Sequence, residues 1–209
     1  SDPSNPVVGQ VWYNSTSQAL KGSALTAAAW ATSNAMNTVR DALGGSGADK
    51  DGALAFGGGS SPSNATANNE SYNGTSWTEV GDLNTSKRDF EGAGVSTTAA
   101  LAFGGMSNPD PTVSATNESW NGSSWTEVGD LNTGRRGIGG AGTSTAALGF
   151  GGNQDGPSSG VTETCNGTSW TEVGDLNTSR SNTAGAGANN TAVLAANGST
   201  TESWNGSSW

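Results

Sequence analysis

The sequence repeats one cassette, and this repetition limits the fold more than any other feature. Each copy runs Glu-Ser-Trp-Asn-Gly-Ser-Ser-Trp, then Thr-Glu-Val-Gly-Asp-Leu-Asn-Thr, then Gly-Ala-Gly and Ala-Leu-Ala-Phe-Gly-Gly, with small variations. The second tryptophan of each copy is found at Trp77, Trp125, Trp170 and Trp209, with a weaker copy at Trp30. A period of 39 to 48 residues, with strand-like segments joined by glycine-rich turns, indicates an all-β protein, a β-propeller whose repeats each form about one four-stranded antiparallel blade.

The order of strands within one repeat follows from its turn signals. In the copy that starts at Trp77 with strand d, we expect strand a around residues 92–95, strand b at 99–103 and strand c at 116–120. Asn121-Gly122 then turns the chain into the next strand d, because Asn-Gly between two strands is the strongest short hairpin signal. The same Asn-Gly-Ser/Thr sequences are glycosylation sequons, and we interpret them here as turns.

In residues 1–33 we expect an amino-terminal partial blade, with strand b at 9–14, strand c at 18–22 and strand d at 28–32. In residues 34–209 we expect the repeats that complete a single propeller domain. The last blade has strands a, b and c, and its strand d begins only at Trp209, so this blade is expected to be truncated and the chain to be a segment of a longer protein. We expect five blades, with four as the alternative. Closure of a five-bladed ring requires the terminal strands to share a blade, or residues beyond this sequence.

Composition argues against several classes of function. The net charge is −10 and only eight Lys and Arg are present, so a nucleic-acid partner is not expected. No run of 18 apolar residues occurs, so membrane insertion is not expected. The absence of His removes the commonest metal ligand and general base, and we predict neither a cofactor nor a catalytic residue.

The charged residues recur from blade to blade, which favours structural roles over catalysis. A basic residue present once per crossover between strands d and a predicts a clasp that bonds crossover carbonyls or a neighbouring carboxylate. The arginines concerned are Arg40, Arg88, Arg135, Arg136 and Arg180. Paired carboxylates can hydrolyse glycosides, but here the same pair recurs on strands c and d, which predicts solvated charges that protect sheet edges. The carboxylates are Glu70, Glu118, Glu163 and Glu202 on strand c, and Glu79, Glu127 and Glu172 on strand d.

Two further features have a functional and a structural interpretation. Cys165 occupies the position of Tyr72, Trp120 and Trp204 in the other copies, so we interpret it as a packing residue and not as a reactive thiol. Three loop clusters carry oxygen ligands of the kind that calcium prefers. They are residues 49–52, 108–111 and 153–156. Their spacing does not match an EF-hand, and Asn, Asp and Gly are ordinary turn residues, so no metal site is predicted.

The loops between strands b and c differ most among the copies, at residues 59–69, 106–117 and 153–162. Strand alternation puts these b–c loops and the d–a crossovers on one face of the propeller, and the Asn-Gly turns and a–b loops on the other. Loops that differ from one another on a regular scaffold are the usual place where a protein recognises a partner. The candidate ligand-binding residues are Asn64, Asn108, Asp110, Asn153 and Asp155.

Gly-Gly after an apolar strand, a downstream aromatic such as Trp120, and Trp125 soon after it together resemble kelch repeats over residues 30–209. Short loops and a low Leu and Val content depart from the usual kelch pattern. The opening Gly-Gln-Val-Trp-Tyr-Asn-Ser-Thr-Ser-Gln-Ala-Leu-Lys-Gly, with the repeats that follow, is similar to kelch-like structural proteins of marine tailed bacteriophages. This resemblance implies a tail-fibre or virion-surface protein.

The leading expectation is a non-enzymatic virion or extracellular module that attaches to a host cell-surface receptor or glycan through its b–c loops. The alternatives are a purely structural spacer that contacts other virion subunits or forms a homo-oligomer, an intracellular kelch adaptor that captures a protein and, last, an enzyme. Fold alone does not decide among them, because propellers host many functions.

Overall fold

The computed structural model describes residues 11–14, 16–22, 33–61, 64–107 and 112–209, and in these ranges all regular structure is β. Among them there is no helix long and apolar enough to cross a membrane. The chain divides into two compact units, Ser1–Ser33 and Asn34–Trp209. In the first unit β1 (Val11–Asn14) pairs antiparallel with β2 (Ala19–Gly22), at the places expected for strands b and c. The expected strand d at 28–32 lies outside the described residues.

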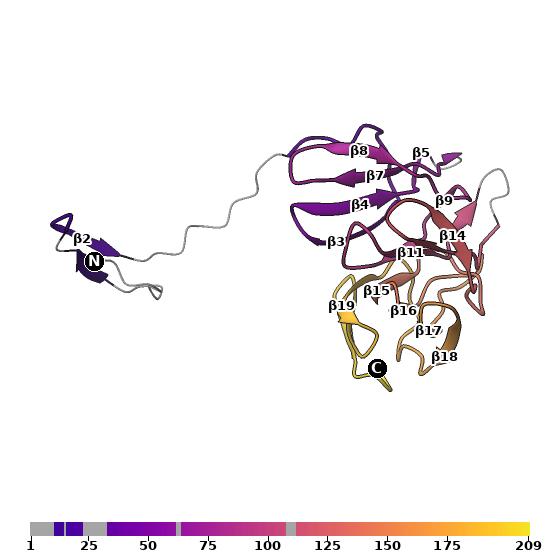
Figure 1. The fold of residues 1–209 in the computed structure, drawn as a ribbon. Coiled ribbons are helices and arrows are strands. Elements are labelled where there is room, and N and C mark those ends of the chain that lie inside the picture. Colours follow the sequence, from indigo (N-terminus) through magenta and orange to yellow (C-terminus); the bar gives the residue numbers. More distant parts are fainter. Residues whose placement is uncertain (1–10, 15, 23–32, 62–63, 108–111) are drawn as a thin grey trace. The chain divides into compact units, whose positions relative to one another are not determined.

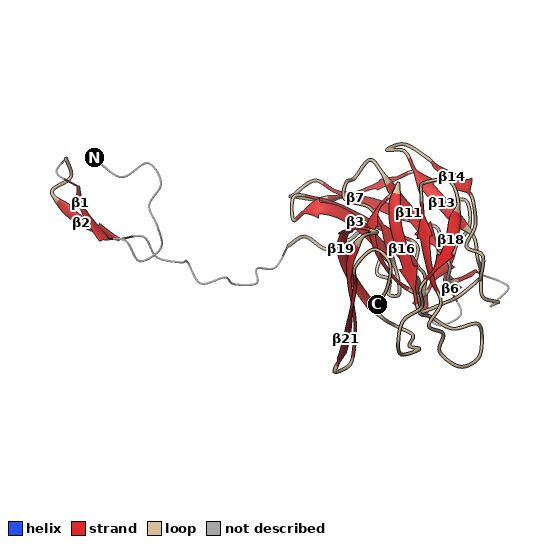
Figure 2. Ribbon diagram, turned by 90° about the horizontal axis from the view of Figure 1, so that it is seen from below, coloured by secondary structure: helices blue, strands red, loops and turns tan. Residues whose placement is uncertain are grey.

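The second unit consists of four antiparallel sheets arranged as a four-bladed β-propeller (Figures 1 and 2). Blade 1 contains β3 (Gly44–Asp49), β4 (Gly52–Phe56), β7 (Asn69–Tyr72) and β8 (Trp77–Val80), and blade 2 contains β10 (Glu91–Ala93), β11 (Ala100–Phe103), β13 (Asn117–Trp120) and β14 (Trp125–Val128). Blade 3 contains β15 (Gly139–Thr143), β16 (Ala146–Phe150), β17 (Thr162–Cys165) and β18 (Trp170–Val173), and blade 4 contains β19 (Ala184–Asn189), β20 (Ala192–Asn197) and β21 (Thr200–Trp204). Two short pairs, β5 (Gly59–Ser61) with β6 (Asn64–Ala65) and β9 (Lys87–Arg88) with β12 (Met106–Ser107), lie in the connections.

The predicted all-β propeller and its a–b–c–d strand order are therefore confirmed. The described part of the chain shows four blades, the smaller of the two expected numbers, and a fifth is not confirmed. The Asn-Gly turns also form as predicted: Asn121 Oδ1 accepts the N–H groups of Ser123 and Ser124, and Gly122 has a φ of +95°.

Glycines in the innermost strands allow neighbouring blades to approach through their backbones. A Cβ atom added to Gly92 of β10 would lie 2.6 Å from the carbonyl oxygen of Gly45 in β3. A Cβ atom on Gly185 of β19 would collide with the carbonyl of Gly140 in β15. The repeated Gly-Ala-Gly segment is thus required by packing around the propeller axis, where larger side chains have no room.

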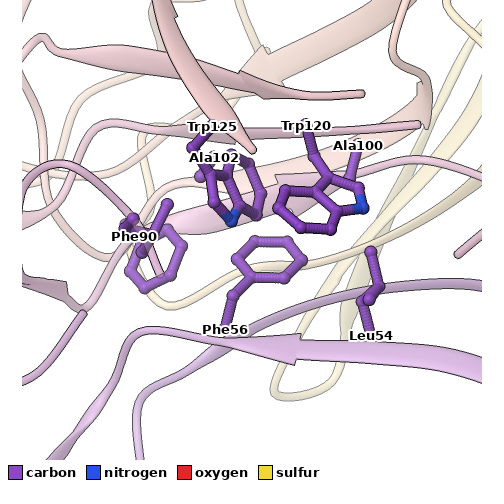
Figure 3. Close-up of a cluster of buried hydrophobic side chains, with 8 residues drawn as sticks. Leu54, Phe56, Phe90, Ala100, Ala102, Trp120 and Trp125 are labelled. Atoms are coloured by element: carbon purple, nitrogen blue, oxygen red, sulfur yellow. The ribbon is translucent and has the colours of Figure 1, made fainter. Parts of the chain in front are cut away.

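The hydrophobic core consists of one aromatic cluster between each pair of consecutive blades. Between blades 1 and 2, Phe56 of β4 packs against Trp125 of β14 with ring centroids 4.8 Å apart, beside Trp120 and Phe90 (Figure 3). Equivalent Phe–Trp pairs join the later blades: Phe103–Trp170 at 4.7 Å and Phe150–Trp209 at 4.9 Å. The repeated tryptophan is the residue that holds each blade to the one before it.

One leucine of blade 4 is much more exposed than the equivalent leucines of the other three blades. Leu54, Leu101 and Leu148 hold equivalent positions in strand b of the first three blades and are at most 2% exposed. Leu194, the corresponding residue of β20, is 47% exposed. The packing that joins consecutive blades is therefore not repeated on the outward face of blade 4.

Buried ion pairs tie each crossover to the blade that it enters. Arg135 Nη2 lies 2.8 Å from Glu163 Oε1 of β17, and Arg135 Nη1 donates to the carbonyl oxygens of Gly151 and Val161. Arg40–Glu70, Lys87–Glu118 and Arg180–Glu202 repeat this arrangement. The predicted clasp is confirmed for Arg40, Arg135 and Arg180, whereas in blade 2 Lys87 takes the place expected for Arg88.

The interpretation of the strand c carboxylates as solvated edge charges is wrong. Glu70, Glu118 and Glu163 are at most 1% exposed, because each accepts bonds from a crossover that runs over strand c. The strand d carboxylates are exposed, as predicted; they are Glu79, Glu127 and Glu172.

Candidate functional site

The b–c loops and the d–a crossovers lie on one face of the propeller, as the strand alternation predicts. Three backbone bonds connect them: Gly58 N–H donates to Lys87 O at 2.9 Å, Gly105 N–H to Arg135 O at 2.7 Å, and Gly152 N–H to Arg180 O at 2.8 Å. The variable loops are therefore anchored on the crossovers, and the two kinds of segment form a single surface. We call it the loop face.

A chain of backbone hydrogen bonds runs through the four crossovers at the loop face. Ala42, Asp89, Gly137 and Asn182 are equivalent residues with φ between +50° and +57°. Asp89 N–H donates to Ala42 O, Gly137 N–H to Asp89 O, and Asn182 N–H to Gly137 O, at 3.1, 2.8 and 2.7 Å. Since the left-handed conformation is uncommon outside glycine, its recurrence identifies a fixed structural element.

A cavity of about 230 Å³ opens on this element. The residues that line it are Asp89, Arg136, Gly137, Asn153 and Asn182. Asp89 and Arg136 come from the crossovers into blades 2 and 3, Asn182 from the crossover into blade 4, and Asn153 from the b–c loop of blade 3. Each side chain in the lining is polar, so the cavity offers hydrogen bonds and little apolar surface.

Contacts within the lining hold Arg136 and Asn153 in place. Their backbones exchange two hydrogen bonds, Arg136 N–H to Asn153 O at 3.0 Å and Asn153 N–H to Arg136 O at 2.9 Å. Arg136 Nε donates to Asn153 Oδ1 at 3.0 Å and lies 3.4 Å from Asp155 Oδ1. Asp89 Oδ2 lies 3.2 Å from Arg88 Nη2. Each carboxylate near the cavity is thus paired with a guanidinium.

The structure brings together two of the five predicted ligand-binding residues. Asn153 lines the cavity, and Asp155 contacts its arginine. Asn64 lies in β6 in the connection of blade 1 and is exposed away from the lining. Asn108 and Asp110 lie outside the described residues.

The sequence analysis missed Asp89, Gly137 and Asn182, and it assigned Arg136 to a clasp, because it gave the crossovers only a structural role. One signal was available: Arg135-Arg136 is the only pair of adjacent arginines. Arg135 forms the clasp with Glu163, so Arg136 does not have that role and instead contacts Asn153 in the b–c loop of blade 3.

The remaining candidates keep structural roles. Within the described residues no three acidic, His or Cys side chains gather as a metal ligand set. In the cluster at 49–52, Asp51 Oδ1 lies 2.5 Å from Lys50 Nζ, and Asp49 Oδ1 accepts the Asp51 N–H. Cys165 is 1% exposed, and burial raises the pKa of its thiol, consistent with a packing residue.

No family model matches this sequence, and no curated protein matches it. The class of protein is therefore defined by its fold, a four-bladed β-propeller in the described part of the chain, with a polar cavity on its loop face.

Proposed function

We propose that this chain is a non-enzymatic β-propeller module of a virion or other extracellular surface, and that it attaches to a host cell-surface glycan through the loop face. The observation that carries the proposal is the polar cavity between the crossovers and the blade 3 loop. It lies where unlike loops meet a rigid scaffold, the usual position of a recognition site.

The chemistry of the lining suits a sugar. Sugar hydroxyl groups both donate and accept hydrogen bonds, and the lining provides the carboxylate of Asp89 as acceptor, the guanidinium of Arg136 as donor, and two amides that do both. The kelch-like pattern of the repeats and the phage-like opening segment favour a tail fibre or another virion protein as the setting.

The charge pairing supports binding over catalysis. Glycoside hydrolysis generally requires two carboxyl groups that flank the scissile bond. Asp89 is the one carboxylate in the lining, and its partner is Arg88. A lining with one carboxylate does not supply the pair that this reaction requires.

A structural spacer within a virion is the second candidate. The observation in its favour is the outward face of blade 4, where Leu194 is 47% exposed. An uncovered apolar sheet face suits contact with another subunit or a second copy of the chain. An intracellular adaptor has less support, because the net charge is −10 and the chain has only eight Lys and Arg residues.

The test is binding of the full chain to a broad glycan array and to intact bacterial cells. The matched variants replace residues 153–158 by a short Gly-Ser turn on the loop face, or change Ser123 to Ala on the opposite face. Saturable binding that is lost only with the loop replacement is expected. Absence of binding to both arrays and cells, with the chain folded and assembled into a defined oligomer, would favour the spacer instead.

A further inference from the structure

We propose that the cavity is a subsite for one neutral sugar unit, opened by the absence of a side chain at Gly137. This inference rests on the proposed glycan attachment and specifies where the glycan is held and which class of sugar fits.

Gly137 departs from the repeat, because it is the one residue of the four equivalent positions in the crossovers that has no side chain. The equivalent residues in the other crossovers, Ala42, Asp89 and Asn182, carry side chains at nearly the same φ. The backbone conformation therefore does not by itself require glycine at 137. A Cβ atom there would lie 2.7 Å from Asn182 Oδ1, one of the atoms of the lining. A side chain at 137 would therefore crowd Asn182 and displace its amide from the position it has in the lining.

The polar groups around this space are already oriented. Arg136 is fixed by Asn153 Oδ1 at its Nε atom and by Met106 Sδ, 3.1 Å away, at Nη1. The backbone of Asn182 is fixed by its bond to Gly137 O. A site whose side chains are held before binding loses less conformational entropy when the ligand arrives. Such a site suits a small rigid ring with several adjacent hydroxyl groups.

The charges select a neutral ring over an acidic one. Arg136 and Asp155 form one pair and Arg88 and Asp89 another, so no cation remains in surplus for a sugar carboxylate. The net charge of −10 adds a repulsive field for anionic glycans. Uronic and sialic acids are therefore expected to bind more weakly than neutral hexoses.

The first variant is Gly137→Ala in the full chain, and its matched control is Gly198→Ala. Gly198 has a φ of +59°, close to that of Gly137, and no atom lies within 4 Å of an added Cβ. The control therefore carries the same backbone strain without filling a cavity. A second variant, Asn153→Ala, removes a lining amide and leaves the backbone bonds with Arg136 in place.

The measurement is ligand-observed NMR titration with D-glucose, D-galactose and D-mannose as neutral probes and D-glucuronate as the anionic probe. We expect at least one neutral hexose to bind the native chain and the Gly198→Ala control equally. Its binding should weaken by about tenfold or more in Gly137→Ala and in Asn153→Ala, a loss equivalent to one or two hydrogen bonds.

Each other outcome overturns the inference. Equal binding by Gly137→Ala and by the control, or binding of glucuronate at least as strong as that of the hexoses, would place the sugar elsewhere or assign it another class. If the array and cells bind the native chain and Gly137→Ala alike, the attachment function stands and the cavity does not serve it. If nothing binds in any format, both proposals fail.

Discussion

Trp209 packs edge-on against Phe150, with ring centroids 4.9 Å apart, and donates its indole N–H to Thr162 Oγ1 at 3.0 Å. Phe150 belongs to blade 3, whereas Trp209 follows the last strand of blade 4. The same Phe–Trp contact recurs between the earlier blades, at Phe56–Trp125 and Phe103–Trp170. Each interface between consecutive blades therefore contains one such Phe–Trp pair, packed among further buried apolar residues.

Replacing Phe150 by Ala should remove this contact and leave a cavity between blades 3 and 4. Phe150 is fully buried, so we expect a loss of about 3–5 kcal/mol in the free energy of unfolding. Urea denaturation followed by tryptophan fluorescence measures it. A loss below about 1 kcal/mol would mean that the aromatic pair does not hold the two blades together.

Equivalent leucines should differ in their contribution to stability. Leu148 of blade 3 is fully buried and Leu194 of blade 4 is 47% exposed. Leu148→Ala should cost about 2–5 kcal/mol, whereas Leu194→Ala should cost less than about 1 kcal/mol, because the exposed side chain buries little area. The comparison uses the same substitution at the same position of the repeat. Similar losses for both variants would indicate that Leu194 is covered in solution, as a contact with another subunit would require.

The fold was predictable from the sequence because its main determinants repeat. Trp125, Trp170 and the Gly-Ala-Gly segments recur in register, and each has one role in every blade. The buried state of Glu118 was not predictable, since a carboxylate on strand c looks the same whether water or a crossover covers it. The cavity was also missed, because Gly137 is informative only when the four crossovers are aligned in space and three of them carry side chains there.

Lys87 should give the stability a distinctive dependence on alkaline pH. Burial lowers its pKa to about 8 from an ordinary 10.5, although Glu118 opposes the shift. Between about pH 8 and 10.5 the unfolded chain holds a proton that the folded chain has released, so the free energy of unfolding should rise with pH in this window, by up to about 3 kcal/mol. Lys87→Arg cannot lose its proton here, and arginine already fills the equivalent clasp at Arg40 and Arg135.

The measurement for Lys87 is chemical denaturation at pH 7.5 and pH 10 for the native chain and for Lys87→Arg. The native chain should gain stability relative to the variant as the pH rises. Arg135→Lys serves as the reverse exchange in blade 3 and should introduce a rise of the same sign. Parallel profiles for the native chain and Lys87→Arg would contradict the assignment of the rise to this residue.

Glu91 should produce the opposite trend at lower pH. It is the one carboxylate at its position among the innermost strands, where the other blades have Gly44, Gly139 and Ala184. Burial raises its pKa to about 7 from an ordinary 4.5, and the backbone N–H groups of Gly92 and Gly140 only partly offset this. Because the folded chain retains a proton that the unfolded chain has lost, this contribution to stability is fully present below about pH 4.5 and is lost as the pH rises through 7.

The change attributable to Glu91 is at most about 3 kcal/mol, and smaller to the extent that water reaches its partly buried carboxyl group. Glu91→Gln keeps the shape of the side chain and cannot ionise. Its free energy of unfolding should exceed that of the native chain at pH 8 and match it at pH 4.5, as measured by urea denaturation at the two values. Glu127→Gln on the exposed strand d is the control and should leave the native profile unchanged. A Glu91→Gln profile that runs parallel to the native one would show that this carboxyl group titrates normally in the folded propeller.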